Sequence, residues 1–421
     1  MKIKVKEISY DKFLELNKYK HKKPIKRSFL LATIIRVISY FELLGVKFKF
    51  NKINMDKVKK NTPCLILMNH SSFIDLKVAS YLLYPRKYNI VCTDDGFVGK
   101  EFLMRWLGCI PTKKFITDTV LVRDLLYTVK NLKSSILMYP EASYSFDGLA
   151  TPLPSYIGKS LKFLKVPLVV IRTYGAFSRD PLYNNLQIRK VNVSADIECV
   201  LSAEEIKEKS EKELTDIVNK YFDFDNFKWQ QENKVAIKEN FRADYLNRIL
   251  YKCPHCQAEG VMEGKGEYLT CTKCNAKYYL DEFGYLKNTN GETLFDSVPK
   301  WSRWERECVK NEIIEGKYLL DCDVDIYALK DMKAIYKIGE GHLIHNNNGF
   351  NLVGCDNRLE YLQSPASSYS LYSDFNWYEI GDIICIGDNE VRYYLVPKDK
   401  KDVVAKARLA AEEMYKLNHK K

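Results

Sequence analysis

The stretch Asn69-His70-Ser71-Ser72-Phe73-Ile74-Asp75 decides how the rest of this sequence is interpreted. It follows the apolar run 63–68, which predicts a buried strand, and it precedes residues 76–83, which favour a helix. A histidine and an aspartate therefore lie just after the carboxyl end of a buried strand. Open α/β sheets place their binding and catalytic groups at that end.

His70 and Asp75 can be tested against helix geometry. They are five residues apart, and on a continuous helix their side chains would point about 140° apart. If His70 lies in the turn before the helix and Asp75 in its first turn, the two side chains can meet. A second interpretation stays open, in which Ser72 is the helix N-cap, Asp75 is the acidic partner of a capping box, and His70 is a loop residue.

Three further stretches follow along the chain. They are Gly-Cys-Ile-Pro-Thr-Lys-Lys at 108–114, Tyr-Pro-Glu-Ala-Ser-Tyr-Ser at 139–145, and Val-Pro-Leu-Val-Val-Ile at 166–171. With the His-x4-Asp motif, and in this order, they resemble the four sequence blocks of the glycerolipid acyltransferases, the 1-acylglycerol-3-phosphate acyltransferase family. The resemblance extends over roughly residues 30–225. It implies an acyltransferase domain.

The resemblance also implies roles for particular residues. His70 would be the general base that deprotonates the acceptor hydroxyl, and Asp75 would orient its imidazole. The hydroxyl would then attack an acyl thioester, either acyl-CoA or acyl-carrier protein, without an acyl-enzyme. The positions that correspond to acceptor-binding blocks are Lys113, Lys114, Glu141, Ser143, Tyr144 and Ser145.

Two positions depart from the family pattern. The second block usually ends in Arg, where this chain has Lys114, and the third block usually reads Phe-Pro-Glu-Gly-Thr-Arg-Ser, so Tyr144 replaces an Arg. A lysine holds phosphate as a point charge and not as a bidentate fork. Either Lys113, Lys114 or Lys159 compensates for the missing cation, or the acceptor is not a simple glycerol phosphate.

The net charge of +12 is concentrated near the start of the chain. Residues 1–60 hold 17 Lys or Arg and 5 Asp or Glu, and 17 − 5 = 12, so the remainder is balanced. The segment 18–27 is strongly basic, and the apolar segment 28–45 behind it is too short and too charged to span a bilayer. This pattern is typical of binding to an anionic membrane surface, where each basic residue contributes roughly 1 kcal/mol. The alternative is a core helix behind a solvated basic segment.

The same composition bears on the compartment. Residues 1–7 lack the apolar core of a secretory signal. The 12 cysteines are mostly scattered, which suits a reducing cytosol better than a disulfide framework. We therefore expect a protein that is peripheral on the cytosolic face of the membrane.

Four cysteines form a separate motif, CxxC…CxxC, with fourteen residues between the pairs. Each pair fits a tight knuckle, and four thiolates complete a closed tetrahedral site for structural zinc. The predicted ligands are Cys253, Cys256, Cys271 and Cys274. His255 lies between two of them and is interpreted as a bystander. A ribbon can also bind nucleic acid, but this segment has no net basic patch.

The chain of 421 residues should hold two or three domains. Apolar runs predict strands at 64–68, 88–92, 135–139 and 167–172, and the alternating stretch 186–197 predicts one further strand. Amphipathic stretches predict helices at 73–84, 98–107, 117–132, 155–164, 202–221 and 232–250. This alternation predicts an α/β domain with a mixed, mostly parallel sheet flanked by helices.

Residues 291–421 hold short β-prone segments and end in an amphipathic helix at 401–417, which resembles a barrel of pleckstrin-homology type. The predicted domains are a membrane-interfacial helical segment, the acyltransferase domain, a zinc ribbon and this β-rich module. Their predicted ranges are 1–60, 61–248, 249–290 and 291–421.

The predicted function is acyl transfer from acyl-CoA or acyl-carrier protein to the hydroxyl of a lysophospholipid, above all 1-acylglycerol 3-phosphate. One alternative is acyl transfer to a different lipid alcohol, such as a non-phosphorylated one, which Tyr144 motivates. A second is a non-catalytic, lipid-binding scaffold that has kept the fold. The β-rich module is interpreted as a site for a protein partner, and nucleic acid is not an expected partner.

Overall fold

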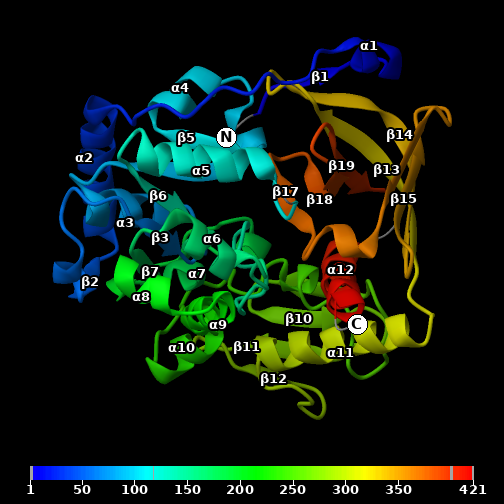
Figure 1. The fold of residues 1–421 in the computed structure, drawn as a ribbon. Helices are drawn as coiled ribbons and strands as arrows, with labels where there is room; N and C mark the ends of the chain where they lie inside the picture. The colour runs from blue at the N-terminus through cyan, green and yellow to red at the C-terminus, as the bar shows by residue number, and fades with distance from the viewer. Residues whose placement is uncertain (1–2, 117, 399–401, 420–421) are drawn as a thin grey trace. The chain divides into compact units, whose positions relative to one another are not determined.

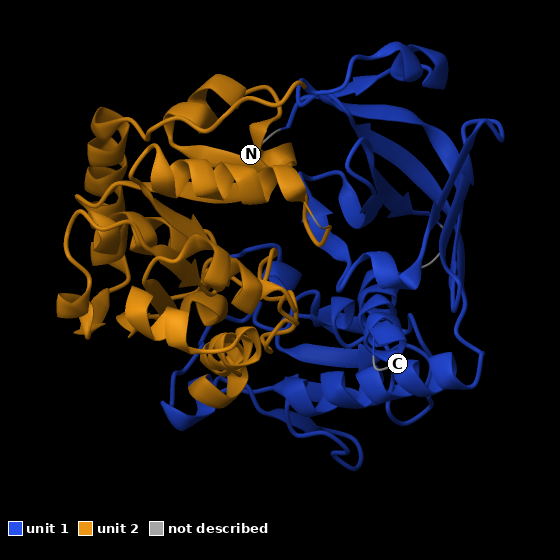
Figure 2. Cartoon of the chain, in the orientation of Figure 1, with its two compact units in different colours: residues 1–19, 182–187, 230–421 blue, residues 20–181, 188–229 orange. Residues whose placement is uncertain are grey.

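The computed structural model describes residues 3–116, 118–398 and 402–419. The chain forms two compact units (Figure 2). Residues 20–181 and 188–229 make the first, here called the parallel-sheet unit, and residues 1–19, 182–187 and 230–421 make the second, here called the ribbon–barrel unit. The predicted boundaries after residues 60, 248 and 290 all fall inside these units, and the division into four domains stays a prediction.

The parallel-sheet unit is built on seven strands in the order β2-β8-β7-β3-β6-β4-β5 (Figure 1). Every neighbouring pair is parallel except β7 and β8, which are antiparallel. The strands are β2 (Lys49–Ile53), β3 (Leu65–Met68), β4 (Tyr88–Thr93), β5 (Cys109–Thr112), β6 (Ser135–Met138), β7 (Leu168–Tyr174) and β8 (Ser194–Leu201). The predicted mixed, mostly parallel sheet is confirmed.

Helices flank this sheet. They are α2 (Phe29–Gly45), α3 (Ile74–Leu83), α4 (Glu101–Trp106), α5 (Thr119–Lys130), α6 (Ile157–Leu164), α7 (Ala176–Arg179), α8 (Ala203–Glu208), α9 (Glu211–Phe222) and α10 (Asn226–Glu232). Residues 1–2, 117 and 401, which belong to predicted segments, lie outside the described residues. Among the described helices, none has the length and apolar character needed to cross a membrane.

The core explains why β3 reads as a continuous apolar run. All four residues of β3 are fully buried, because a central strand of a parallel sheet is covered on both faces. Leu65 and Leu67 join a cluster that includes Leu125 of α5, Leu161 of α6 and Leu214 of α9. This packing holds the carboxyl end of β3 in a fixed place.

Three predictions about elements were wrong. The predicted helix 202–221 is two helices, because Ser210 starts a second capping box with Glu213. The predicted strand within 186–197 begins only at Ser194. The predicted helix 232–250 does not form beyond the end of α10 and the short 3-10 turn η4 (Leu246–Arg248). Some of its backbone N–H groups instead bond to the ribbon, as in Ala243 to Gly266 and Tyr245 to Gly264.

The ribbon–barrel unit holds two antiparallel sheets. The ribbon contains β9 (Met262–Lys265), β10 (Tyr268–Cys271), β11 (Lys277–Leu280) and β12 (Leu286–Asn288). The larger sheet contains β13 (Leu320–Leu329), β14 (Ile335–Asn346), β15 (Gly349–Gly354), β16 (Leu359–Gln363), β17 (Tyr372–Trp377), β18 (Gly381–Gly387) and β19 (Arg392–Pro397). Its order is β16-β15-β14-β13-β19-β18-β17, so β13, the first of these strands along the chain, pairs with β19, the last.

Helices α11 (Val298–Ile314) and α12 (Val403–His419) accompany these sheets. The predicted β-rich, barrel-like region with a C-terminal helix is confirmed. The N-terminal segment divides between the units: β1 (Val5–Glu7) pairs with β14, and α1 (Tyr10–Glu15) lies in the same unit, whereas α2 belongs to the parallel-sheet unit. Residues 1–60 are therefore not one helical segment.

Candidate active site

The His-x4-Asp motif folds as a turn between β3 and α3. His70 Nδ1 lies 3.2 Å from Asp75 Oδ2. The same carboxylate oxygen accepts the backbone N–H groups of Ser71 and Ser72, at 2.6 and 2.9 Å. Asp75 therefore does both things that the sequence left open, because it ties down the turn and also meets His70.

The detail of the predicted cap was wrong. The helix starts at Ile74, with Phe73 in the N-cap position, so Asp75 is the second helical residue and not the third. Ser72 Oγ accepts the N–H of Ile74 at 3.3 Å instead of that of Asp75. Asp75 Oδ2 nevertheless accepts the N–H of Ser72 at 2.9 Å, which is the second of the two bonds of a capping box.

Two residues that the sequence reasoning missed hold this pair to the neighbouring strand. Asn69 Oδ1 accepts from the backbone N and the Oγ1 of Thr173, at 2.8 and 3.1 Å. Thr173 Oγ1 also lies 3.4 Å from Asp75 Oδ1. Thr173 is two residues beyond the fourth block, near the end of β7, which pairs with β3. Its place at the carboxyl end of a neighbouring strand was the available signal.

Two tyrosines lie against the imidazole of His70. The ring centroid of Tyr139 is 4.0 Å from that of His70, with 25° between the ring planes. The centroid of Tyr144 is 4.2 Å away, with 37° between the planes. Phe73, which is exposed, contacts Tyr144 edge-on at 5.5 Å. The structure thus places Tyr144 beside the predicted base, and it adds Tyr139, which the sequence reasoning missed.

The surroundings of His70 favour its neutral form. Burial is the main cause that lowers its pKa; the hydrogen bond and the charge of Asp75 oppose this, and the charge of Lys114 lowers the pKa further. Asp75 itself is fully buried. A neutral imidazole can accept a proton, and the carboxylate beside it can stabilise the imidazolium that results.

The third block forms the turn that follows β6. Ala142 has a positive φ of 57°, where the family usually has Gly. Ser145 donates its backbone N–H to the carbonyl oxygen of His70 at 2.7 Å, which joins this turn to the first block. Ser143 and Ser145 are buried in it. Both serines therefore lie in the wall of the site as turn residues.

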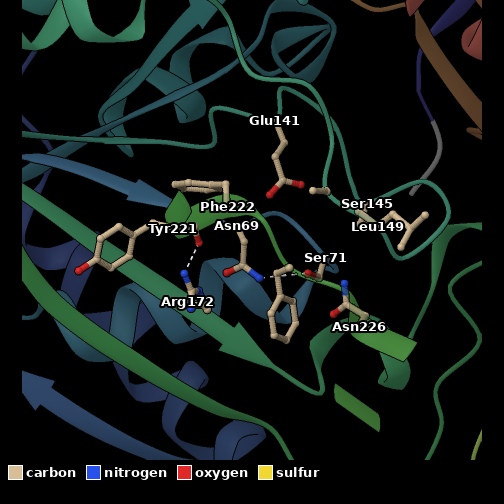
Figure 3. Close-up of a pocket in the computed structure, with 11 residues that line it drawn as sticks. Asn69, Ser71, Glu141, Ser145, Leu149, Arg172, Tyr221, Phe222 and Asn226 are labelled. Carbon is tan, nitrogen blue, oxygen red and sulfur yellow. Dashed lines mark hydrogen bonds between the residues drawn. The ribbon is translucent and has the colours of Figure 1, made fainter. Parts of the chain in front are cut away.

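A small cavity opens beside this turn (Figure 3). Its polar lining includes Glu141 and Ser145 from the third block, Asn69 and Ser71 from the first, and Arg172 of β7. The guanidinium of Arg172 donates to the carbonyl oxygen of Tyr221, drawn as a dashed line in Figure 3. Arg172 directly follows the fourth block, and the sequence reasoning missed this cation. Lys113 and Lys114, the two lysines among the predicted acceptor-binding residues, are half-buried.

The four predicted zinc ligands come together in the ribbon–barrel unit. Their Sγ atoms all lie within 4.8 Å of one another, and two pairs, Cys253–Cys274 and Cys256–Cys271, are 3.6 and 3.7 Å apart. Thiolates about 2.3 Å from a tetrahedral zinc ion would be about 3.8 Å apart. The cluster therefore fits zinc. His255 Nε2 instead lies 2.9 Å from the hydroxyl of Tyr278, outside the ligand set.

The histidine site lies within a stretch of the chain that matches a known protein family. A family model described as Acyltransferase matches residues 49–167, which contain the first three blocks. One similar solved structure is the 1-acyl-sn-glycerophosphate (LPA) acyltransferase PlsC from Thermotoga maritima, with 14% identity and a TM-score of 0.38, over 45% of this chain and 76% of that one. The search of curated proteins found no match. The predicted recognition is confirmed: this chain carries a domain of the acyltransferase family.

Proposed function

We propose that this protein transfers a fatty acyl group from a thioester of CoA or acyl-carrier protein to the hydroxyl of a lysophospholipid, 1-acylglycerol 3-phosphate. One observation carries the proposal. A buried Asp75 and a partly exposed His70 are paired at the carboxyl end of the central strand β3, within the residues that match the acyltransferase family.

The proposed chemistry uses His70 as a general base. The Nδ1–H of His70 is donated to Asp75, which leaves Nε2 to take the proton of the acceptor hydroxyl. The hydroxyl oxygen attacks the thioester carbonyl carbon and forms a tetrahedral intermediate. When the intermediate collapses, the C–S bond breaks, and the imidazolium returns its proton to the leaving thiolate. The products are an ester and a free thiol, and His70 is neutral again.

Lys114 supports an anionic acceptor. Its positive charge acts on His70, so an anion near the reacting hydroxyl would meet a cation from the second block. Glu141 of the third block lines the cavity and is proposed to bind the acceptor. The alternative acceptor is a different, non-phosphorylated lipid alcohol. It is favoured by Tyr144, because an uncharged ring takes the place of a second cation.

The decisive measurement is thioester consumption by the purified protein with acyl-CoA and 1-acylglycerol 3-phosphate, wild type beside His70→Ala. We expect the variant to lose activity by about 10²- to 10⁴-fold, the usual contribution of a positioned base. An unchanged melting temperature and unchanged zinc content serve as controls. Equal turnover in the two proteins would refute the role of His70. An acceptor panel that includes uncharged lipid alcohols, and acyl-carrier protein as donor, tests the two substrates.

We also propose that the protein binds the surface of membranes with anionic lipid, through α2. Phe29, Leu30 and Phe41 on this helix are 66–69% exposed, and only Ser39 and Leu43 of the helix are buried. Exposed apolar side chains in such number on one helix mark a surface for a partner or a membrane. The substrates of the proposed reaction are lipids, which favours the membrane.

Sedimentation with vesicles tests this part of the proposal. The double substitution Phe29→Ser and Phe41→Ser should reduce binding to vesicles that contain anionic lipid by about tenfold or more. Leu362→Ser is the matched control, because Leu362 on β16 is also 66% exposed but belongs to the other unit. Equal binding by the two variants would contradict the assignment to α2.

A further inference from the structure

The two tyrosine rings beside His70 lie on opposite faces of its imidazole. Their centroids are 4.0 and 4.2 Å from that of the imidazole, and neither ring is tilted by more than 37°. Two six-membered rings at such distances would overlap if they shared one face. His70 is therefore held between Tyr139 and Tyr144.

The same turn supplies both rings, and the backbone connects it to His70. Tyr139 and Tyr144 are the first and the sixth residue of the third block. The next residue, Ser145, donates its N–H to the carbonyl oxygen of His70 at 2.7 Å. The turn that sets the position and orientation of the two rings is therefore itself hydrogen-bonded to His70.

A hydrogen bond from its hydroxyl does not explain why Tyr139 lies against His70. Its hydroxyl is buried and has no hydrogen-bond partner among the described residues. Burial raises the pKa of this hydroxyl well above its usual value, so it stays protonated and uncharged. The part of Tyr139 that contacts His70 is the face of its ring.

We propose that Tyr139 and Tyr144 form an aromatic clamp, in which Tyr144 is a positioning residue that holds the imidazole of His70 in the orientation needed for acyl transfer. The inference rests on the proposed function and deepens it. The clamp keeps Nδ1 on Asp75, 3.2 Å away, and leaves the edge that carries Nε2 for the acceptor.

The proposed clamp changes what Tyr144 implies about the acceptor. If Tyr144 only fills the place of a missing phosphate-binding Arg, then Tyr144→Arg should improve activity on a phosphorylated acceptor. If Tyr144 positions His70, the same substitution removes one face of the clamp and lowers activity on every acceptor. The charged and titratable groups that face His70 are Asp75, Lys114, Tyr139 and Tyr144.

The first experiment compares kcat, KM and their pH profiles for the full-length wild type, Tyr144→Phe, Tyr144→Ala and Tyr144→Arg. We expect Tyr144→Phe to keep kcat within about twofold, because it keeps the ring. Tyr144→Ala should lower kcat by roughly 10- to 100-fold with a smaller change in KM. The acid limb of its profile should move to higher pH, because water reaches the imidazole. Tyr144→Arg should be impaired with phosphorylated and uncharged acceptors alike.

The second experiment does not depend on turnover. The NMR signal of the His70 Cε1–H, assigned by its loss in His70→Ala, should be shifted upfield by the two rings. It should move downfield by several tenths of a ppm in Tyr144→Ala and stay in place in Tyr144→Phe. An unmoved signal, or unchanged kcat in Tyr144→Ala, would overturn the clamp, as would a gain of activity in Tyr144→Arg. A shifted signal in a protein without turnover would support the clamp and refute the proposed function.

Discussion

The cysteine cluster and the histidine site are both small groups of polar side chains, but they are built in different ways. In the cluster, four equivalent groups converge, and each pair comes from one tight turn: Gln257 donates its N–H to the carbonyl of Cys253, and Asn275 does the same to Cys271. In the histidine site, a carboxylate, a lysine and two tyrosine rings surround His70, and Thr173 in turn contacts Asp75. These groups come from four separated stretches of chain.

This difference teaches what each site is for. A closed set of four thiolates leaves no open position, which suits a structural metal. The histidine site keeps features that a purely structural site would not need. Ala142 adopts a left-handed conformation, Asp180 is a buried acid that contacts the first block, and the hydroxyl of Tyr139 lacks a partner among the described residues. Such costs gather where a protein functions.

The largest effect is expected when the cysteine cluster loses one of its four ligands. Cys256→Ser removes one of four ligands, and the free energy of zinc binding in such sites is about 10–16 kcal/mol in isolated peptides. We expect the bound zinc to fall from one ion per chain to almost none and the melting temperature to drop. Atomic absorption and calorimetry measure these changes. Cys308→Ser is the control, since Cys308 on α11 lies outside the cluster. Full zinc content in Cys256→Ser would contradict the site.

The histidine site is tested by the substitution Asp75→Asn. Asparagine lacks the negative charge that stabilises the imidazolium of His70, so we expect the rate of acyl transfer to fall by about 10²- to 10⁴-fold. Asp124→Asn is a matched control, because Asp124 is also buried and also pairs with a histidine, 3.2 Å from His21 Nε2. If both variants lost the same activity, the loss could not be assigned to the pair of His70 and Asp75.

The stability of the protein should depend on pH through Asp180, the buried acid that contacts the first block of the histidine site. Burial raises the pKa of Asp180 to about 6, although Arg179 lies 3.0 Å away. Because the pKa is higher in the folded protein, stability from this group is fully present below about pH 4 and is lost as the pH rises through about 6. Asp180→Asn should therefore increase the free energy of unfolding more at pH 7.5 than at pH 4.5, by about 1–3 kcal/mol.

Urea denaturation at these two pH values measures the difference for Asp180→Asn. Asp216→Asn, an exposed substitution on α9, is the control. The same change in unfolding free energy at both pH values would show that Asp180 titrates normally in the folded protein.

The smallest effect concerns the turn of the third block. Ala142→Gly relieves a left-handed conformation, with φ at 57°, and should stabilise the protein by about 0.5–1 kcal/mol. Thermal or urea denaturation measures it. Ala32→Gly, inside α2, should have the opposite sign, because glycine costs about 1 kcal/mol in a helix interior. A destabilised Ala142→Gly would mean that packing of the Ala142 methyl group contributes more to the free energy of unfolding than the backbone strain costs.

Both sites could be predicted to the extent that their residues are close in sequence. The pairing of His70 with Asp75 follows from one strand, one turn and one helix, and each cysteine pair follows from one knuckle. The contacts of Tyr139 with His70 and of Thr173 with Asp75 were not predicted. Each residue lies at or near the carboxyl end of a strand, but nothing local to it indicates which strand will be its neighbour. The predicted helix 232–250 failed for the same reason, since its backbone bonds to a distant ribbon.

The sequence by itself determined the buried strand β3, the His-x4-Asp turn after it, the four cysteines and the order of the family's blocks. These depend on patterns within a few residues, where side-chain period and turn chemistry act directly. Only the tertiary structure decided that β7 lies beside β3, so that Thr173 reaches Asp75, and that the third block folds back over His70. The order of strands in a sheet comes from burying the whole core at once, and no single stretch of the chain contains that information.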